Sequence, residues 1–288
     1  MSSTSVLYDA PGPKTVARHK LYSTLTIAVL LLILAFIGYR LFDTGQFAYA
    51  KWEPFVTPRY ISALLINGVL TTLSMAAAAV VGAVALGLVL GLGKLSDHRW
   101  ISVPSFLVVE FFRAVPVLLL MIFVFFTFFI TKGDTGAYWS VVIALSFYNG
   151  AVLAEVFRAG INAVPKGQSE AAFALGLRKS QVTWIVQLPQ AVKIMLPALI
   201  SQCVVTLKDT SLGYAVASPG LTKVGQAIYQ QFQNQVPAVL VLAALYILMN
   251  LALTALATVV QRRFVGEKSP TVMVGASAGE DTSGRRGV

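Results

Sequence analysis

Six stretches of this chain are long and apolar enough to cross a lipid bilayer. A helix rises 1.5 Å per residue, so about 20 apolar residues span the roughly 30 Å of hydrocarbon in a membrane. Runs of this length predict helices, because a helix satisfies its own backbone hydrogen bonds in the absence of water. The predicted spans are residues 22–42, 64–93, 104–130, 138–159, 194–216 and 236–260.

The charge content also indicates a multi-pass membrane protein. Charged residues make up 12% of the chain and the mean hydropathy is +0.75, whereas a soluble domain carries about 25% charged residues. The net charge of +10 would suggest nucleic-acid binding in a soluble chain. Here the basic residues lie between apolar runs, so we expect the lipid bilayer as a partner and no nucleic acid.

The lysines and arginines predict the orientation of the spans. With the N-terminus placed inside, fifteen of them lie in the inner segments and five in the outer segments. Because cytoplasmic segments are enriched in basic residues, both termini are predicted to be cytoplasmic. Residues 14–50 imitate a signal peptide with a cleavage-like site at Ala48-Tyr-Ala50, but their apolar stretch is long for one. We expect this stretch to be retained as the first transmembrane helix.

The chain divides into four predicted parts. These are a cytoplasmic N-terminal segment (1–20), the first transmembrane helix with an outer loop (21–60), a core (61–262) and a tail (263–288). The tail is rich in Gly, Ser and charge, which predicts disorder. In the second span, small residues allow close helix packing, and packing within the bundle is favoured over a dimer seam. They are Gly82, Gly87, Gly91 and Gly93.

No catalytic or metal-binding constellation is visible. Cys203 is the single cysteine, so a disulfide within the chain is impossible and a thiol metal site is not expected. The nearest imitation of a nucleotide-binding loop, Gly91-Leu-Gly93-Lys94-Leu95, lacks the required first glycine and the Ser or Thr after the lysine. We therefore expect a protein that is not an enzyme and has no cofactor of its own.

A polar, basic loop at 160–192 carries the start and stop signals of a short helix. Pro165 suits a first helical position, Glu170 lies in the early turns and Gly176 suits the C-terminal stop. The signals predict a helix of about ten residues. Alanines keep one side of it slim, so that a partner protein can approach closely. An amphipathic surface helix with no partner remains the alternative.

The motifs of this loop resemble the EAA loop of ABC importer permeases. Glu170-Ala171-Ala172 is followed by Gly176 and by Val186-Gln-Leu188-Pro189, with Val186 where the family usually has Ile. Other segments resemble the polar amino acid uptake subfamily, and the N-terminal residues 6–13 resemble actinobacterial glutamate permease subunits. The segments are Asn67-Gly68 with Thr71-Thr72-Leu73, Glu110-Phe-Phe-Arg113-Ala-Val-Pro116, Glu155-Val-Phe-Arg158-Ala-Gly160 and Lys208-Asp209-Thr210-Ser211-Leu212.

The resemblance implies an all-α membrane protein with the type I ABC importer permease fold, in the plasma membrane of a bacterium. It implies a second permease subunit, two copies of a separate ATPase that binds ATP and Mg, and an extracytoplasmic solute-binding protein. The implied substrate is L-glutamate, with glutamine or another polar amino acid as the alternative. The implied ATPase-coupling residues are Glu170, Ala171, Ala172, Gly176, Leu188 and Pro189. The competing class, a secondary transporter, often has internal repeats, and no convincing repeat is visible here.

Charged groups at membrane depth are costly, so they are paired or functional. Glu110 with Arg113, and Glu155 with Arg158, have the i, i+3 spacing of one helix face, which predicts structural or gating pairs. Lys208 and Asp209 are adjacent and do not face each other, so one of them can point into a pathway.

A transported amino acid needs donors for its carboxylate and acceptors for its ammonium group, to replace the water that it loses. For Asn67 and Thr71, hydrogen bonding between helices is the alternative role. The candidate residues of this substrate path are Asn67, Thr71, Arg113, Lys208, Asp209, Thr210 and Ser211.

Overall fold

The computed structural model describes residues 13–265, and these residues form helices and short connections with no strand among them. Most of the predicted tail therefore lies outside the described residues, as does most of the N-terminal segment that resembles glutamate permeases. The longer helices are α1 (Pro13–Asp43), α4 (Thr71–Lys94), α5 (Arg99–Ala114), α7 (Gly133–Asn162), α10 (Leu188–Asp209), α11 (Leu221–Phe232) and α12 (Gln235–Val265).

Shorter helical segments connect the long ones. The short α-helices are α2 (Tyr49–Trp52), α3 (Pro58–Ser62), α6 (Val117–Val124), α8 (Lys166–Ala174) and α9 (Lys179–Gln181). The 3-10 segments are η1 (Glu53–Phe55), η4 (Ile130–Lys132) and η6 (Thr210–Val216), and the π-helical segments are η2 (Ala63–Leu70), η3 (Phe125–Phe129) and η5 (Val182–Gln187).

The centre of the bundle is the tightly packed pair α4 and α7. A Cβ atom added at Gly87 would lie 2.7 Å from the Cβ of Leu153, and one added at Gly91 would lie 2.8 Å from the carbonyl oxygen of Ala154. Real Cβ atoms do not approach other atoms so closely, so these glycines allow the two backbones to meet. The predicted role of the glycines in packing within the bundle is confirmed.

The predicted third span, 104–130, is wrong as a single helix, because the chain breaks between α5 and α6. Val115 is extended, with φ −79° and ψ 128°, since the ring of Pro116 clashes with a helical conformation of the preceding residue. Proline also lacks the N–H that would continue the helical ladder. With 16 residues, α5 is about 24 Å long, which is shorter than the roughly 30 Å of hydrocarbon in a membrane. A complete crossing by this segment therefore needs both α5 and α6.

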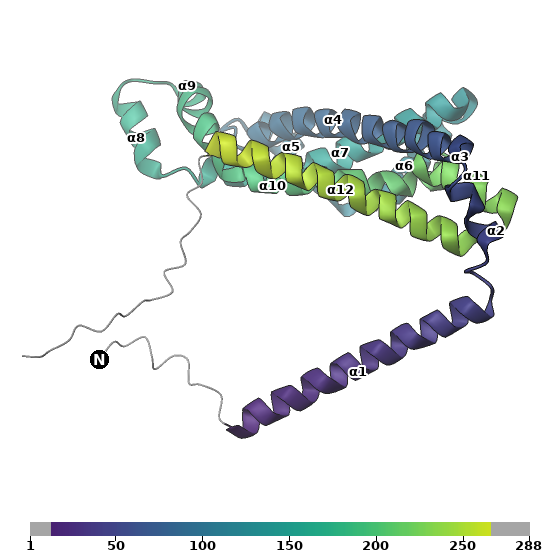
Figure 1. Cartoon of the computed structure of the whole chain (residues 1–288). Coiled ribbons are helices and arrows are strands. Elements are labelled where there is room, and N and C mark those ends of the chain that lie inside the picture. The colour runs from purple at the N-terminus through teal and green to yellow at the C-terminus, as the bar shows by residue number, and fades with distance from the viewer. Residues whose placement is uncertain (1–12, 266–288) are drawn as a thin grey trace, which may run out of the picture.

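Five helical stretches in the described part of the chain are long and apolar enough to span a membrane. One of them, Val117–Asn162, reverses at Gly133, where φ is 56°, so that α6 and α7 pack side by side. The second predicted span begins earlier than expected, at Pro58. The helix α1 stands apart from the bundle (Figure 1), and none of its apolar window is buried.

The two ends of the bundle carry different elements. Figure 1 shows α8 and α9 at one end, beside the last turns of α12, and α2, α3 and α11 at the opposite end. That the α8 end faces the cytoplasm remains a prediction from the distribution of basic residues.

Candidate functional site

The helix α8 in the 160–192 loop ends in a glycine-dependent stop. Gly176 has a φ of +79°. Its N–H donates to the carbonyl of Phe173 at 2.9 Å, and the N–H of Leu177 donates to the carbonyl of Ala172 at 3.2 Å. These two bonds form a Schellman motif, in which a left-handed residue satisfies the last carbonyls of a helix. The predicted stop at Gly176 is confirmed, and the helix has nine residues with Pro165 one position before its start.

The tip of this loop presents apolar side chains outward. Leu175 is 84% exposed and Phe173 is 50% exposed, whereas Ala172 is buried. Glu170 and Ala171 are exposed on the same short helix. The tip of the loop therefore exposes apolar surface. The loop returns through η5 to α10, which begins at half-buried Leu188 and exposed Pro189.

Both predicted glutamate–arginine pairs are formed. Arg113 Nη1 lies 3.2 Å from Glu110 Oε1 on α5, and Arg158 Nη2 lies 2.9 Å from Glu155 Oε2 on α7. Lys94 joins the two pairs, because its ammonium contacts the Glu155 carboxylate and lies 3.5 Å from Glu110 Oε1. Sequence reasoning missed Lys94, since a link between residues 61 positions apart leaves no local spacing signal.

The other predicted charged residues lie on α10. Lys208 is exposed, Asp209 is half-buried and Thr210 is buried, with its hydroxyl donating to the carbonyl of Leu207 at 2.6 Å. At Thr210 the α-helix tightens into η6, which also contains Ser211. Among residues 13–265, neither Lys208 nor Asp209 forms an ion pair. The prediction that these neighbours do not neutralise each other by simple contact is confirmed.

The candidate path residues do not form a single cluster. Thr71 begins α4 and Lys94 ends it, and 24 residues of helix measure about 36 Å. Arg113 shares Glu110 with Lys94 and therefore lies at that end of α4. Asn67 and Thr71 lie at the other end, where Leu207 of α10 and Leu64 belong to one buried apolar cluster. The structure thus groups Asn67, Thr71 and residues 208–211 at one end of the bundle, and places Arg113 at the other.

Thr72, rather than its neighbour Thr71, makes a hydrogen bond between distant elements. Its hydroxyl oxygen accepts the N–H of Leu221 at 2.9 Å, and its side chain is buried. This bond holds the first turn of α11 against α4. Asn149 of α7 plays a similar role, because its buried amide oxygen accepts a hydrogen bond from Gln202 of α10. The polar character of both residues was the only sequence signal for these roles.

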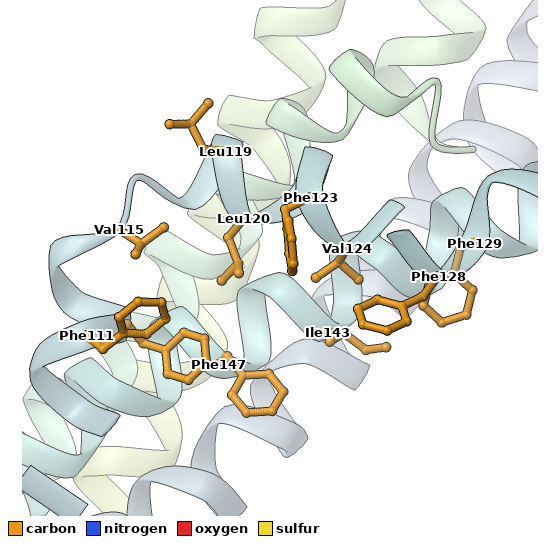
Figure 2. Close-up of a pocket in the computed structure, with 11 residues that line it drawn as sticks. Phe111, Val115, Leu119, Leu120, Phe123, Val124, Phe128, Phe129, Ile143 and Phe147 are labelled. Atoms are coloured by element: carbon orange, nitrogen blue, oxygen red, sulfur yellow. The ribbon is translucent and has the colours of Figure 1, made fainter. Parts of the chain in front are cut away.

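An apolar cavity of about 660 Å³ lies at the break between α5 and α6. Figure 2 shows its lining of hydrocarbon side chains, with Phe111 on α5 and Val115 at the break on one side, and Leu120, Phe123 and Val124 of α6 on the other. An amino acid held there would lose its water and gain no hydrogen-bond partner from these side chains, which is unfavourable. The cavity is therefore not a binding site for a polar substrate.

Comparisons with known proteins identify similar chains. Residues 83–266 match the model of the family described as binding-protein-dependent transport system inner membrane component. The glutamate transport system permease protein GluD of Corynebacterium glutamicum is 41% identical over 222 residues, which cover 76% of this chain and 81% of that relative. The arginine transport system permease protein ArtQ of Bacillus subtilis is 30% identical over 207 residues, covering 69% and 92%.

A solved structure has a similar fold. It is the crystal structure of an amino acid ABC transporter with histidines, with a TM-score of 0.64 and 28% identity. The similarity covers 71% of this chain and 95% of that one.

Proposed function

This chain belongs to the family of binding-protein-dependent transport system inner membrane components, and on that premise we propose that it is the permease subunit of an ATP-driven importer of polar amino acids, with L-glutamate as its substrate. The identity of 41% with a glutamate permease supports this substrate. The identity with the arginine permease is lower, at 30%. Glutamine is the alternative substrate.

The observation that carries the proposal is the exposed tip of α8. A short helix with a glycine stop presents Phe173 and Leu175 to the surroundings at one end of a membrane bundle. Such a tip suits a groove on a separate ATPase, which binds ATP and Mg. In this proposal Glu170, Ala171 and Ala172 lie at the contact, while Leu188 and Pro189 connect the contact to α10. Two ATPase copies, a second permease and an extracytoplasmic solute-binding protein complete the complex.

The substrate path in this proposal runs past the opposite end of the bundle. Lys208 is exposed there and forms no ion pair within residues 13–265, so its ammonium suits the carboxylate of an anionic substrate. Half-buried Asp209 suits the substrate ammonium, and Asn67, Thr71, Thr210 and Ser211 supply neutral partners. Arg113 is held by Glu110 at the other end and serves later in the path.

Competition in vesicles that hold the whole complex tests the proposal. Uptake of labelled L-glutamate is measured with ATP supplied on the α8 side and with an excess of unlabelled glutamate, glutamine, arginine or histidine. We expect uptake to require ATP and unlabelled glutamate to suppress it most. ATP-driven uptake of labelled arginine or histidine in vesicles that take up no labelled glutamate would refute the anionic substrate and leave the importer standing. Uptake without ATP would refute the importer itself.

A further inference from the structure

Lys94 is the residue through which charged groups connect three helices. It is the last residue of α4, and its side chain is only 8% exposed. Its ammonium contacts Glu155 on α7 and lies at the longer distance of 3.5 Å from Glu110 on α5. Each carboxylate also has its own arginine three positions later on the same helix. Each arginine therefore forms an ion pair within its own helix, whereas the contacts of Lys94 join α4 to α5 and α7.

The three linked helices are not equally fixed. The glycine contacts described above pack α4 directly against α7. The helix α5 is held less extensively: its one buried residue is Val109, and its close glycine contact is to a flexible hydroxyl, that of Ser105, which a Cβ atom added at Gly93 of α4 would meet. Beyond α5 come the extended Val115 and the apolar cavity, so α5 is not close-packed against α6 (Figure 2). Because closely packed segments resist displacement more than loosely packed ones do, α5 is the least firmly held of the three helices.

The 160–192 loop contacts the chain directly after Lys94. Lys179, at the start of α9, contacts the carboxylate of Asp97, and its ammonium donates to the carbonyl of Leu95 at 3.3 Å. Leu95 directly follows Lys94, and Asp97 lies in the connection between α4 and α5. A displacement of the loop therefore pulls on the residues that carry Lys94 and lead into α5.

We propose that Lys94 is a positioning residue that transmits movement of the 160–192 loop to α5, by holding α5 against the α4–α7 pair in this state and releasing it in another. The inference rests on the proposed coupling of that loop to an ATPase and adds the route that the movement takes. The short contact to Glu155 and the longer one to Glu110 define the present state. When α5 is released, the longer contact to Glu110 is lost and the ammonium stays on Glu155.

The first test replaces Lys94 with methionine, which has a similar length and no charge. Glu110 and Glu155 keep their arginines, so this change leaves neither carboxylate without a cation. In the reconstituted complex we expect Lys94→Met to lower the glutamate taken up per ATP hydrolysed by about fivefold or more, the usual scale of coupling between sites, while ATP hydrolysis persists. Lys94→Arg should restore most of this ratio. Arg40→Met, which breaks an i, i+3 pair on α1, should leave it unchanged.

The second test follows α5 directly. With Cys203 replaced by serine, spin labels are attached to cysteines at Leu107 on α5 and Asn162 on α7, both exposed positions. We expect the distance between the labels to change when ATP and vanadate are added, and this change to disappear with Lys94→Met. Glu110→Gln removes the contact on α5 and leaves Lys94 on Glu155, so it should also abolish the change in distance. This variant serves as the test if the Lys94→Met protein does not assemble.

The outcomes separate this inference from the function on which it rests. If the unaltered complex takes up no glutamate with ATP, the proposed function is wrong. If the unaltered complex transports, and Lys94→Met or Glu110→Gln keeps both the uptake per ATP and the nucleotide-dependent distance change, the role of Lys94 is refuted.

Discussion

Thr72 and Leu221 are 149 positions apart in the chain, yet the N–H of Leu221 donates to the hydroxyl oxygen of Thr72 at 2.9 Å. The preceding Gly220 has a φ of +138°, and a Cβ atom there would lie 2.9 Å from the same hydroxyl. The turn into α11 is thus built around one side chain of α4. This contact joins the segment after Asp209 to the helix that ends at Lys94.

Loss of the Thr72 hydroxyl should therefore loosen α11. Thr72→Val keeps the shape of the side chain and removes the acceptor, leaving the buried N–H of Leu221 unpaired at a cost of about 1–3 kcal/mol. We expect a lower thermal unfolding midpoint for the purified protein in detergent. Thr71→Val, a matched change at the less buried neighbouring position, is the control. Equal midpoints for the two variants would contradict the structural role of Thr72.

Gly176→Leu should impair ATP-driven uptake while membrane insertion is kept. In this chain a Cβ at Gly176 meets nothing within 4 Å, so the effect comes from forcing a residue with a side chain into the left-handed conformation, which costs about 1–2 kcal/mol. Uptake and ATPase co-purification are measured together. Gly167→Leu, near the start of α8 and also in open space, should be milder. Gly176→Asn should restore function, because asparagine tolerates a positive φ. Normal uptake by a Gly176→Leu variant that retains its ATPase would count against docking through α8.

Asp209→Asn should reduce transport more than it reduces ATP hydrolysis. The half-buried carboxylate has no ion-pair partner among residues 13–265, and hydrogen bonds to a charged group contribute about 1.5–3 kcal/mol. Loss of that free energy corresponds to a fall of about tenfold or more in the maximal uptake rate, and we expect assembly to stay intact. Asp43→Asn on α1 is the control. Unchanged uptake kinetics would remove Asp209 from the path.

Lys208 should distinguish glutamate from glutamine, which have nearly the same shape and differ in charge. Lys208→Gln removes a cation that suits the side-chain carboxylate. We expect the KM for glutamate to rise about tenfold relative to the KM for glutamine, as for loss of one charge-assisted hydrogen bond. Lys223→Gln, whose lysine pairs with Asp134 at 2.5 Å, is the matched control. An equal rise for both substrates would place Lys208 at the backbone carboxylate of the amino acid instead.

The sequence predicts what depends on local chemistry. The helix stop at Gly176 could be predicted because a left-handed residue favours glycine, and the pairs Glu110–Arg113 and Glu155–Arg158 because their spacing is three. Long apolar runs predict spans by length alone. The break in the third span carried a local signal in Val115-Pro116, but an apolar run that continues past a proline hides it.

Other features depend on packing between distant segments. Lys94 lies at the end of an apolar helix and looks like an ordinary cytoplasmic flank, until the fold brings Glu110 and Glu155 beside it. Thr71 and Thr72 are indistinguishable in sequence, and only the position of α11 decides which hydroxyl is used. Likewise, the separation of Arg113 from Thr71 follows from the direction of α4, which motif order does not contain.

The isolation of α1 has a consequence for how the protein is made. Within the described residues this helix buries none of its apolar window, so it contributes little packing energy to the bundle that follows. It is synthesised before the helices of the bundle, and Lys14, Arg18 and Lys20 precede or begin its apolar stretch. Basic residues beside a transmembrane helix bias that end toward the cytoplasm, so we expect α1 to help set the orientation of the spans that follow it. The sequence of α1 is therefore limited mainly by the needs of membrane insertion, whereas the sequence of α4 is limited by its close packing against α7.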